Sequence, residues 1–200
     1  MMDIVKEING HTLEFYEDDH LYLVDGKIVP SVTQVLSHKF GSKYNGVPTD
    51  VLKARASEGT RVHEAIERLC KTGEMTDLPE VKNFLFLQKA FKFEVVDNEV
   101  PVILFHAQEP IAAGRLDLVI KTDEGLGLAD IKRTSVLDRD YLFYQLNIYK
   151  IAYEQCYWQD ISFLKGIHLK ENQRRYAHIP MNSPMTWELI ADYMRSQNDL

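Results

Sequence analysis

The stretch GRLDLVIKTDEGLGLADIKRTS, residues 114–135, decides the fold, because it has the pattern of two apolar strands joined by a glycine-containing turn. Each strand carries an acid inside its apolar run, Asp117 in RLDLVI and Asp130 in LADIK. Residues two apart in a strand share a face, so we expect Lys132 to point to the same side as Asp130. The turn lets Asp117 lie near Asp130 across the hairpin. The stretch therefore predicts a β-hairpin that brings two acids and a lysine close together.

Charged groups of this kind are costly to bury unless they are paired or bind a metal. Two adjacent carboxylates repel each other, and they are stable together if one is protonated or a cation bridges them. Mg²⁺ prefers oxygen ligands, and a bound metal polarises a phosphate oxygen and activates a water molecule, while a neighbouring lysine stabilises phosphate charge. The alternative is an ordinary hairpin with a solvated ion-pair face. The D…D-x-K pattern alone leaves both readings open.

Composition places the chain among soluble globular proteins. Its 200 residues are enough for one domain, and 45% of them are hydrophobic and 26% charged. We expect no membrane span, because no apolar run reaches 18 residues, and no signal peptide, because the first residues have no apolar segment after a basic start. The net charge of −7 argues against a broad basic nucleic-acid surface, but not against nucleic acid bound at a metal-filled cleft.

The chain has only two cysteines, Cys70 and Cys156, and they form neither a CxxC pair nor a zinc-finger pattern. Both fall in stretches with helical periodicity, which favours buried free thiols. This cysteine usage is typical of a reducing compartment, so we expect a cytoplasmic protein.

The N-terminal part predicts a small hairpin region and a short helix. Aromatic and β-branched residues alternate over residues 13–29 around Asp25 and Gly26, a pair that favours a tight turn. Ser31 is the expected N-cap of the short helix, and Gln34 completes a capping box.

The remaining pattern predicts a mixed sheet flanked by helices. Helices are expected over residues 50–71, 79–93, 141–158 and 184–196, and strands within 94–132, 161–170 and 174–180. Gly59 and Thr60 leave open whether residues 50–71 form two helices or one kinked helix. The order predicts an α/β or α+β fold. We expect a single domain, with an N-terminal hairpin and helix (1–48), a core (49–180) and a C-terminal helix (181–200).

Two helices carry further candidate site residues. His63 and Glu67 in GTRVHEAIE are four residues apart, and so are Gln145 and Tyr149 in YQLNIY. Residues with this spacing share one helical face. Each pair alone is compatible with an ordinary core or surface position.

Taken together, these motifs resemble the PD-(D/E)XK nuclease superfamily, and within it the RecB-type nucleases and related phage exonucleases. The matching elements are GTRVHE, GRLDLVI, LADIKRTS and YQLNIY, in the order of the family. The segment HLYLVDGKIVPSVTQVLS is similar to the opening of phage-encoded members, so the resemblance spans about residues 20–150. Each motif is degenerate, but four in order are fairly specific. The resemblance implies a restriction-endonuclease-like core.

The resemblance also implies a role for each matching residue. Asp117 and Asp130 would ligate the metal, Mg²⁺ or Mn²⁺, together with His63 and the backbone carbonyl of Ile131. Lys132 would be the catalytic lysine beside the attacking water.

Three further positions take their roles from the same resemblance. Gln145 and Tyr149 match the QxxxY element, which helps to order the active site and to engage DNA. Glu99 is a candidate for the acid that some relatives carry on the first strand, where it would serve a second metal. The alternative for Glu99 is an exposed acid at a strand end.

The chain departs from the family pattern in some places. Members often have threonine directly after the lysine, whereas here Arg133 precedes Thr134. Arg133 would then contact phosphate or be solvated. Several relatives bind an iron–sulfur cluster through four cysteines, so two cysteines imply no cluster. No Walker A pattern is present, so any ATP-driven motor would be a separate protein.

The expected function is therefore a metal-dependent DNA nuclease, and more specifically an exonuclease in phage or bacterial DNA recombination or repair. The expected partners are DNA and a single-strand annealing or recombination protein, in the cytoplasm of a bacterial or phage-infected cell. The alternative is a catalytically inactive DNA-binding or assembly module with the same fold. A third reading is an unrelated α/β protein whose acids form surface ion pairs.

Overall fold

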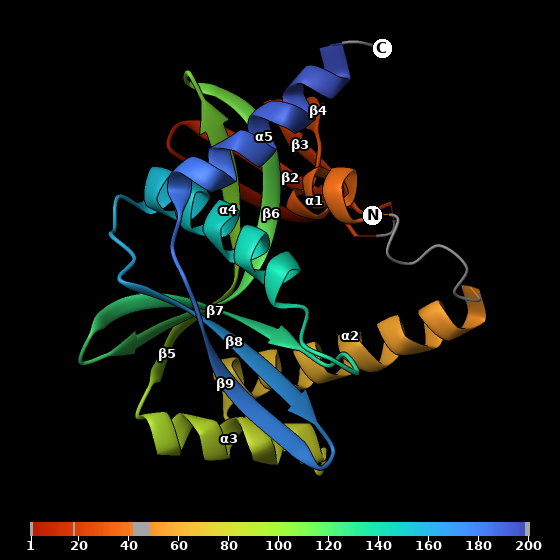
Figure 1. The fold of residues 1–200 in the computed structure, drawn as a ribbon, viewed down its shortest axis with the longest axis vertical. Coiled ribbons are helices and arrows are strands. Elements are labelled where there is room, and N and C mark those ends of the chain that lie inside the picture. The colour runs from red at the N-terminus through yellow and green to blue at the C-terminus, as the bar shows by residue number, and fades with distance from the viewer. Residues whose placement is uncertain (1, 18, 42–48, 199–200) are drawn as a thin grey trace.

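The computed structural model describes residues 2–17, 19–41 and 49–198, which form an α+β fold of two sheets and five helices (Figure 1). The strands are β1 (Met2–Ile8), β2 (His11–Tyr16), β3 (Leu21–Val24), β4 (Lys27–Val29), β5 (Glu94–His106), β6 (Glu109–Thr122), β7 (Gly125–Lys132), β8 (Phe163–Lys170) and β9 (Gln173–Ile179). The helices are α1 (Val32–Phe40), α2 (Thr49–Thr72), α3 (Pro79–Phe91), α4 (Arg139–Tyr157) and α5 (Ser183–Asn198). The predicted helices and strands are thus confirmed, with small shifts of their ends. None of these helices combines the length and apolarity that a membrane crossing requires.

The N-terminal sheet is an antiparallel meander in the order β1-β2-β3-β4. The predicted turn at Asp25 and Gly26 joins β3 to β4, and both residues have positive φ, as a tight hairpin turn requires. The hairpin prediction omitted β1, which pairs with β2 across a second such turn at Asn9 and Gly10. The predicted hairpin region, residues 13–29, therefore covers three strands of a four-stranded sheet.

Helix α1 begins with the predicted capping box. The Ser31 hydroxyl accepts a hydrogen bond from the Gln34 amide at 3.1 Å, and the Ser31 amide donates to the Gln34 side chain at 2.7 Å. The proposed boundary at residue 48 lies outside the described residues. Helix α2 is one continuous helix, so Gly59 and Thr60 do not divide it.

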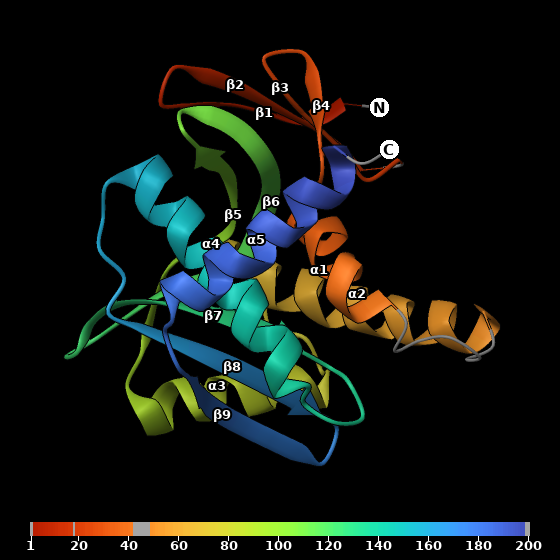
Figure 2. The ribbon, with the colours of Figure 1, turned by 45° about the horizontal axis from the view of Figure 1, so that its top comes forward.

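The second sheet has the order β5-β6-β7-β8-β9, and it is mixed, as predicted. All neighbours are antiparallel except β7 and β8, which are parallel. A parallel pair needs a crossover connection, and α4 provides it. Helix α4 packs on one face of this sheet, while α2 and α3 cover the other (Figures 1 and 2).

The two sheets share a hydrophobic core. Strands β5 and β6 extend beyond the rest of their sheet toward the N-terminal sheet (Figure 2). A backbone bridge between Ser31 and Ala113 joins the two parts, and the Ala113 amide donates to the Pro30 carbonyl at 3.0 Å. One buried cluster runs from Ile8 through α4 to Ile190. The N-terminal sheet is therefore packed against the sheet that carries the two acids.

Two glycines give a matched test of this packing. A Cβ at Gly127 in β7 would lie 2.1 Å from the Phe163 ring, whereas a Cβ at Gly59 in α2 would meet nothing within 4 Å. Gly127→Ala should therefore lower the free energy of unfolding by about 1–3 kcal/mol or more, because it overpacks the core. Gly59→Ala should raise it by about 0.5–1 kcal/mol, because alanine favours the helix. Urea unfolding of both variants measures this, and a stable Gly127→Ala protein would contradict the described packing of β7 on β8.

Candidate active site

A cavity of about 960 Å³ lies between α2, the middle of the five-stranded sheet, α4 and the N-terminal sheet. Every side chain that the sequence predicts for the site lines it: His63, Glu99, Asp117, Asp130, Lys132, Gln145 and Tyr149. These residues come from α2, β5, β6, β7 and α4. The fold thus brings together positions that are up to 86 residues apart in the chain.

The hairpin register places the two acids on one face of the sheet. Strands β6 and β7 are antiparallel, and Leu118 pairs with Ala129, so the same register sets Asp117 opposite Asp130. Directly opposite residues of antiparallel strands point to the same side. Both acids line the cavity, as the sequence predicts.

Glu99 lies in the middle of β5 and only 13% of its side chain is exposed, so the alternative of an exposed strand-end acid is wrong. Its φ of 50° is in the left-handed region, which is uncommon for a residue with a side chain. The Arg115 Nε lies 2.6 Å from the Glu99 Oε2. Burial, followed by the nearby charge of Asp117, raises the pKa of Glu99 to about 7, although the Arg115 guanidinium opposes the shift.

His63, Glu99 and Asp117 form a cluster whose candidate ligand atoms all lie within 4.8 Å of one another. The His63 Nε2 lies 2.9 Å from the Ile131 carbonyl oxygen, which can only accept, so this nitrogen carries the proton. The Nδ1 faces the Asp117 Oδ2 at 3.6 Å, and it presents a lone pair whenever it carries no proton. Two acceptors facing each other leave a position that a cation would satisfy.

The backbone of Ile131 fixes this arrangement. Its amide donates to the Asp117 Oδ2 at 2.6 Å, while its carbonyl accepts the His63 hydrogen bond. The carbonyl that the resemblance assigns to the metal therefore orients the imidazole in this structure. Such an outer partner sets the tautomer of a ligating histidine.

Asp130 is 1% exposed, and it lies outside the cluster of His63, Glu99 and Asp117. The Lys132 ammonium lies 2.6 Å from its Oδ2, and neither Asp130 oxygen has a well-aligned hydrogen bond among the described residues. Burial, reinforced by Asp117 and opposed by Lys132, raises the pKa of Asp130 to about 6. A solvated ion-pair face is therefore excluded for this strand.

Lys132 remains charged in this setting. Burial alone would lower its pKa, but the Asp130 and Asp117 carboxylates hold the pKa above the ordinary value. Its side chain keeps access to the cavity, with 23% exposed. A fixed cation thus lies at the edge of the acidic cluster.

Helix α4 contributes Gln145 and Tyr149 to the lining of the cavity. Burial raises the pKa of Tyr149 well above its usual value, so the hydroxyl stays protonated. A Cβ at Gly114 would lie 2.9 Å from the Tyr149 ring, so the glycine lets this ring approach β6. The Gln145 Oε1 is buried without a hydrogen-bond partner among the described residues. Both polar groups are available to a ligand in the cavity.

Both expectations for Arg133, a contact with phosphate and a solvated side chain, are wrong. Its Nε donates to the buried Glu80 carboxylate at 2.9 Å, and its Nη1 donates to the Glu58 carboxylate. Arg133 therefore joins β7 to α3 and α2, and it is neither solvated nor free for a phosphate.

The structure also adds cavity residues that the sequence reading missed. Arg115 precedes Asp117 by two residues, so strand periodicity could have placed it on the same face. Tyr22 comes from the N-terminal sheet, and burial raises its pKa to about 12. No local pattern links Tyr22 to the hairpin. Of the cysteines, Cys156 is buried as predicted, whereas Cys70 is half-buried.

The donor set fits a hard divalent cation. Carboxylate oxygens suit Mg²⁺ and Mn²⁺, and one imidazole nitrogen is acceptable to Mn²⁺. Burial first, with a smaller contribution from the Asp117 charge, raises the pKa values of Glu99 and Asp130 although Arg115 and Lys132 oppose the shifts, so the anionic forms of both acids carry an excess free energy here. A bound cation would relieve this excess.

Comparisons with known proteins do not assign the chain to a family. No family model matches it. No curated protein matches it. Among solved structures, the chain is similar to one titled "Crystal structure of SSO0001", with a TM-score of 0.48 and 16% identity over 85% of this chain and 76% of that chain. Similarity at this level assigns neither a fold family nor a function.

The raised pKa of Glu99 predicts a pH-dependent stability. Its carboxyl titrates near 4.5 when unfolded and near 7 when folded, so the native state holds the proton more tightly. Stability from this group is present below the unfolded value and is lost as pH rises toward 7. The melting temperature of Glu99→Gln, relative to that of the unaltered metal-free protein, should therefore increase as the pH rises from about 4.5 to 7.

Differential scanning fluorimetry in EDTA across this range measures the effect. Added Mn²⁺ should raise the melting temperature of the unaltered protein at pH 7.5, because it binds the folded state only. A constant difference between the two proteins at all pH values would contradict the burial of an ionisable Glu99.

The cluster geometry predicts which acid matters most for metal affinity. Asp117→Ala should weaken Mn²⁺ binding at least tenfold, because Asp117 faces both His63 and Glu99. Asp123→Ala, at the exposed β6–β7 turn, is the matched control and should bind as the unaltered protein does. Isothermal titration calorimetry measures both affinities, and equal affinities would show that the ligands are misassigned.

Proposed function

We propose that this chain is a metal-dependent DNA nuclease, built as one domain with a restriction-endonuclease-like core, which uses Mg²⁺ or Mn²⁺ to hydrolyse phosphodiester bonds. The observation that carries the proposal is the convergence of His63, Glu99 and Asp117 within 4.8 Å, beside the buried pair of Asp130 and Lys132. The motif order in the sequence supports the same reaction class independently.

The metal would be held by His63, Asp117 and Glu99, with Asp130 at the margin of the cluster. When bound, a divalent cation polarises a phosphate oxygen and makes a bound water more acidic. The protein contributes the orientation of these ligands, since the Ile131 backbone fixes both His63 and Asp117. Preorganised ligands of this kind lower the cost of assembling the site.

Lys132 supplies the cation that phosphoryl transfer needs. Negative charge grows on the phosphoryl oxygens as the water attacks. A fixed ammonium therefore stabilises the transition state more than the ground state. Asp130 holds the Lys132 Nζ at 2.6 Å and so determines its position. Tyr149, with its hydroxyl protonated, and Gln145 can donate hydrogen bonds to the substrate backbone.

The proposed substrate is DNA. The chain would act as an exonuclease together with an annealing or recombination protein, in recombination or repair in a bacterial or phage-infected cell. These finer points rest on the resemblance of the motifs. A module that has lost activity would have no need for a buried lysine beside the acids, so the intact Asp130–Lys132 pair favours catalysis.

Incubation with linear, circular and single-stranded DNA tests the proposal directly, with Mg²⁺, Mn²⁺ or EDTA. Linear DNA should be degraded with either metal and should stay intact in EDTA, and an exonuclease should spare covalently closed circles. DNA that stays intact under all conditions, although the protein binds it, would favour the inactive module.

Lys132→Ala should lower the rate of DNA hydrolysis by about 10²–10³, because one electrostatic donor to the phosphoryl group is lost. The matched control is Lys121→Ala, an exposed lysine on β6 outside the cavity, which should cleave at the unaltered rate. Lys132→Arg should rescue poorly, because the guanidinium is larger and planar. Single-turnover degradation of end-labelled DNA at saturating Mn²⁺ measures the rates, with Mn²⁺ binding confirmed for each variant. An unchanged rate in Lys132→Ala would remove the lysine from the mechanism.

A further inference from the structure

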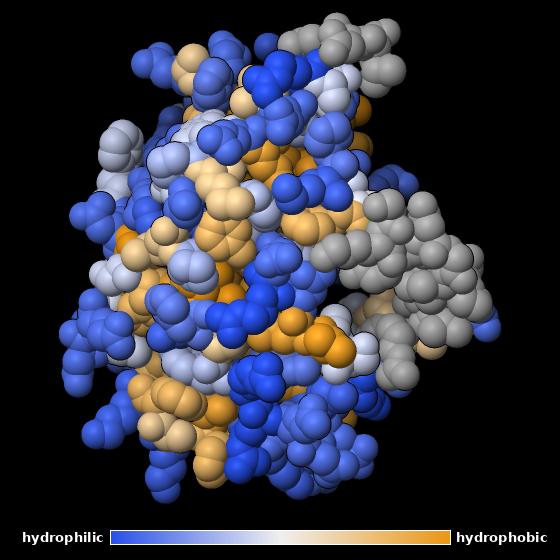
Figure 3. Space-filling model, viewed as in Figure 1, coloured by the Kyte–Doolittle hydropathy of each residue, from blue (hydrophilic) through white to orange (hydrophobic). Residues whose placement is uncertain are grey.

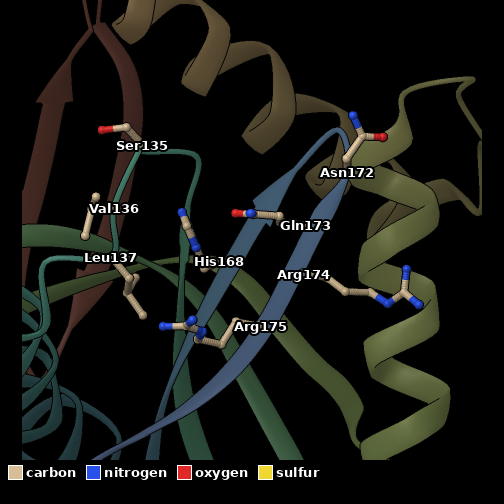
Figure 4. Close-up of a pocket in the computed structure, with 8 residues that line it drawn as sticks. All are labelled: Ser135, Val136, Leu137, His168, Asn172, Gln173, Arg174 and Arg175. Atoms are coloured by element: carbon tan, nitrogen blue, oxygen red, sulfur yellow. The ribbon is translucent and has the colours of Figure 1, made fainter.

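A second cavity, of about 660 Å³, lies between the loop that follows β7 and the β8–β9 hairpin (Figure 4). Its volume is within the range of small-molecule sites. It is lined by Ser135, Val136, Leu137, His168, Asn172, Gln173, Arg174 and Arg175. None of these residues is acidic, although the chain has 30 acids and a net charge of −7. This cavity therefore differs in charge from the acidic site beside it.

Strand register connects this cavity to the proposed active site. Lys132 in β7 is the direct neighbour of His168 in β8, and His168 is the direct neighbour of Arg175 in β9. Side chains of directly paired residues point to the same face of a sheet. Lys132, His168 and Arg175 thus form a row of nitrogen donors that leads away from the acids.

The sheet spacing sets the length of this row. Neighbouring strands lie ~4.8 Å apart, so the backbones of Lys132 and Arg175 are separated by about 10 Å. Stacked nucleotides rise by ~3.4 Å each, so this separation covers at most about three nucleotides.

The side chains of His168 and Arg175 differ in their contacts. The His168 Nε2 donates to the Thr134 carbonyl at 2.7 Å, which ties the loop to β8. Arg175 is exposed and its guanidinium has no partner among the described residues. It extends toward Leu137 in Figure 4, and Figure 3 shows that hydrophilic side chains cover much of the surface over β8 and β9.

The adjacent Arg174 provides the contrast. It points to α3 in Figure 4, where it donates to the Asn83 Oδ1 at 2.9 Å and stacks 3.7 Å from the Phe86 ring centre. One arginine of the pair is thus used to hold α3, while Arg175 on the other face stays available. Arg133, closer to the acids, is neutralised by Glu80 and Glu58. Among the described residues that line this cavity, Arg175 is the arginine that remains for a ligand.

We infer that this cavity binds a backbone phosphate of the nucleic-acid strand, at most about three nucleotides from the phosphate that lies at Lys132. The inference rests on the proposed function and adds to it a second contact point for the strand. Arginine matches phosphate with paired hydrogen bonds, and the cavity presents no carboxylate that would repel the phosphate. In an acidic protein, such a local contact supplies the attraction that net charge does not.

Arg175→Ala tests the inference without disturbing buried groups. The probe is a fluorescein-labelled single-stranded 20-mer, with Ca²⁺ in place of Mn²⁺, followed by anisotropy at several salt concentrations. The dissociation constant should rise about tenfold, because a charge-assisted contact is lost. The slope of log affinity against log salt should become shallower by ~0.7, the value for one phosphate of a single strand. Arg175→Lys should fall between the two, and Lys89→Ala, an exposed lysine on α3, should match the unaltered protein.

A second readout separates this cavity from the active site. Bis(p-nitrophenyl) phosphate is a diester without a neighbouring phosphate, so Arg175→Ala should hydrolyse it at the unaltered rate while its KM for DNA rises. Equal losses on both substrates, or wild-type DNA affinity and salt slope in Arg175→Ala, would overturn the inference. So would displacement of the 20-mer by a 5′-mononucleotide at equal phosphate concentration. Failure of the unaltered protein to bind or cleave DNA would instead overturn the proposed function.

Discussion

The arrangement of this fold depends on one constraint, the placement of three carboxylates on neighbouring strands of a β-sheet. Asp117 and Asp130 face each other across the β6–β7 hairpin, and Glu99 enters from β5 at the same level. Carboxylates at this depth are costly unless cations or donors surround them. Arg115 and Lys132 supply two charges, yet burial still raises the pKa values of Glu99 and Asp130. The fold therefore holds a site that a divalent cation would stabilise.

Two helices enclose these carboxylates, and the neighbouring strands place basic side chains to one side of them. Helix α2 brings His63 onto the Ile131 backbone, and α4, as the crossover between β7 and β8, brings Gln145 and Tyr149 into the same cavity. The same crossover makes β8 the neighbour of β7, so the donors of β8 and β9 begin beside Lys132. The acidic cavity and the donor row are thus consequences of one topology. In the function that we propose, a substrate phosphate would meet the acidic cavity on one side and a cationic contact on the other.

Local signals in the sequence were enough to predict much of this arrangement. The capping box at Ser31, the turn at Gly26 and the alternation around Asp117 each act within a few residues, so their structural result can be read directly. Contacts between distant segments could not be read in this way. The partners of Arg133 lie 53 and 75 residues away, and the place of Arg175 depends on a parallel strand pair formed after α4. The left-handed backbone of Glu99 leaves no sequence signal at all.

We propose that a divalent cation completes the cluster of His63, Glu99 and Asp117. Anomalous X-ray diffraction from crystals grown with Mn²⁺ tests it most directly, because the metal is located independently of any assay. We expect one strong anomalous peak in the acidic cavity, about 2 Å from the His63 Nδ1 and from an Asp117 oxygen. The imidazole should still donate its other nitrogen to the Ile131 carbonyl. A cavity without a peak, at Mn²⁺ concentrations that saturate the melting-temperature shift, would show that these residues do not hold the metal.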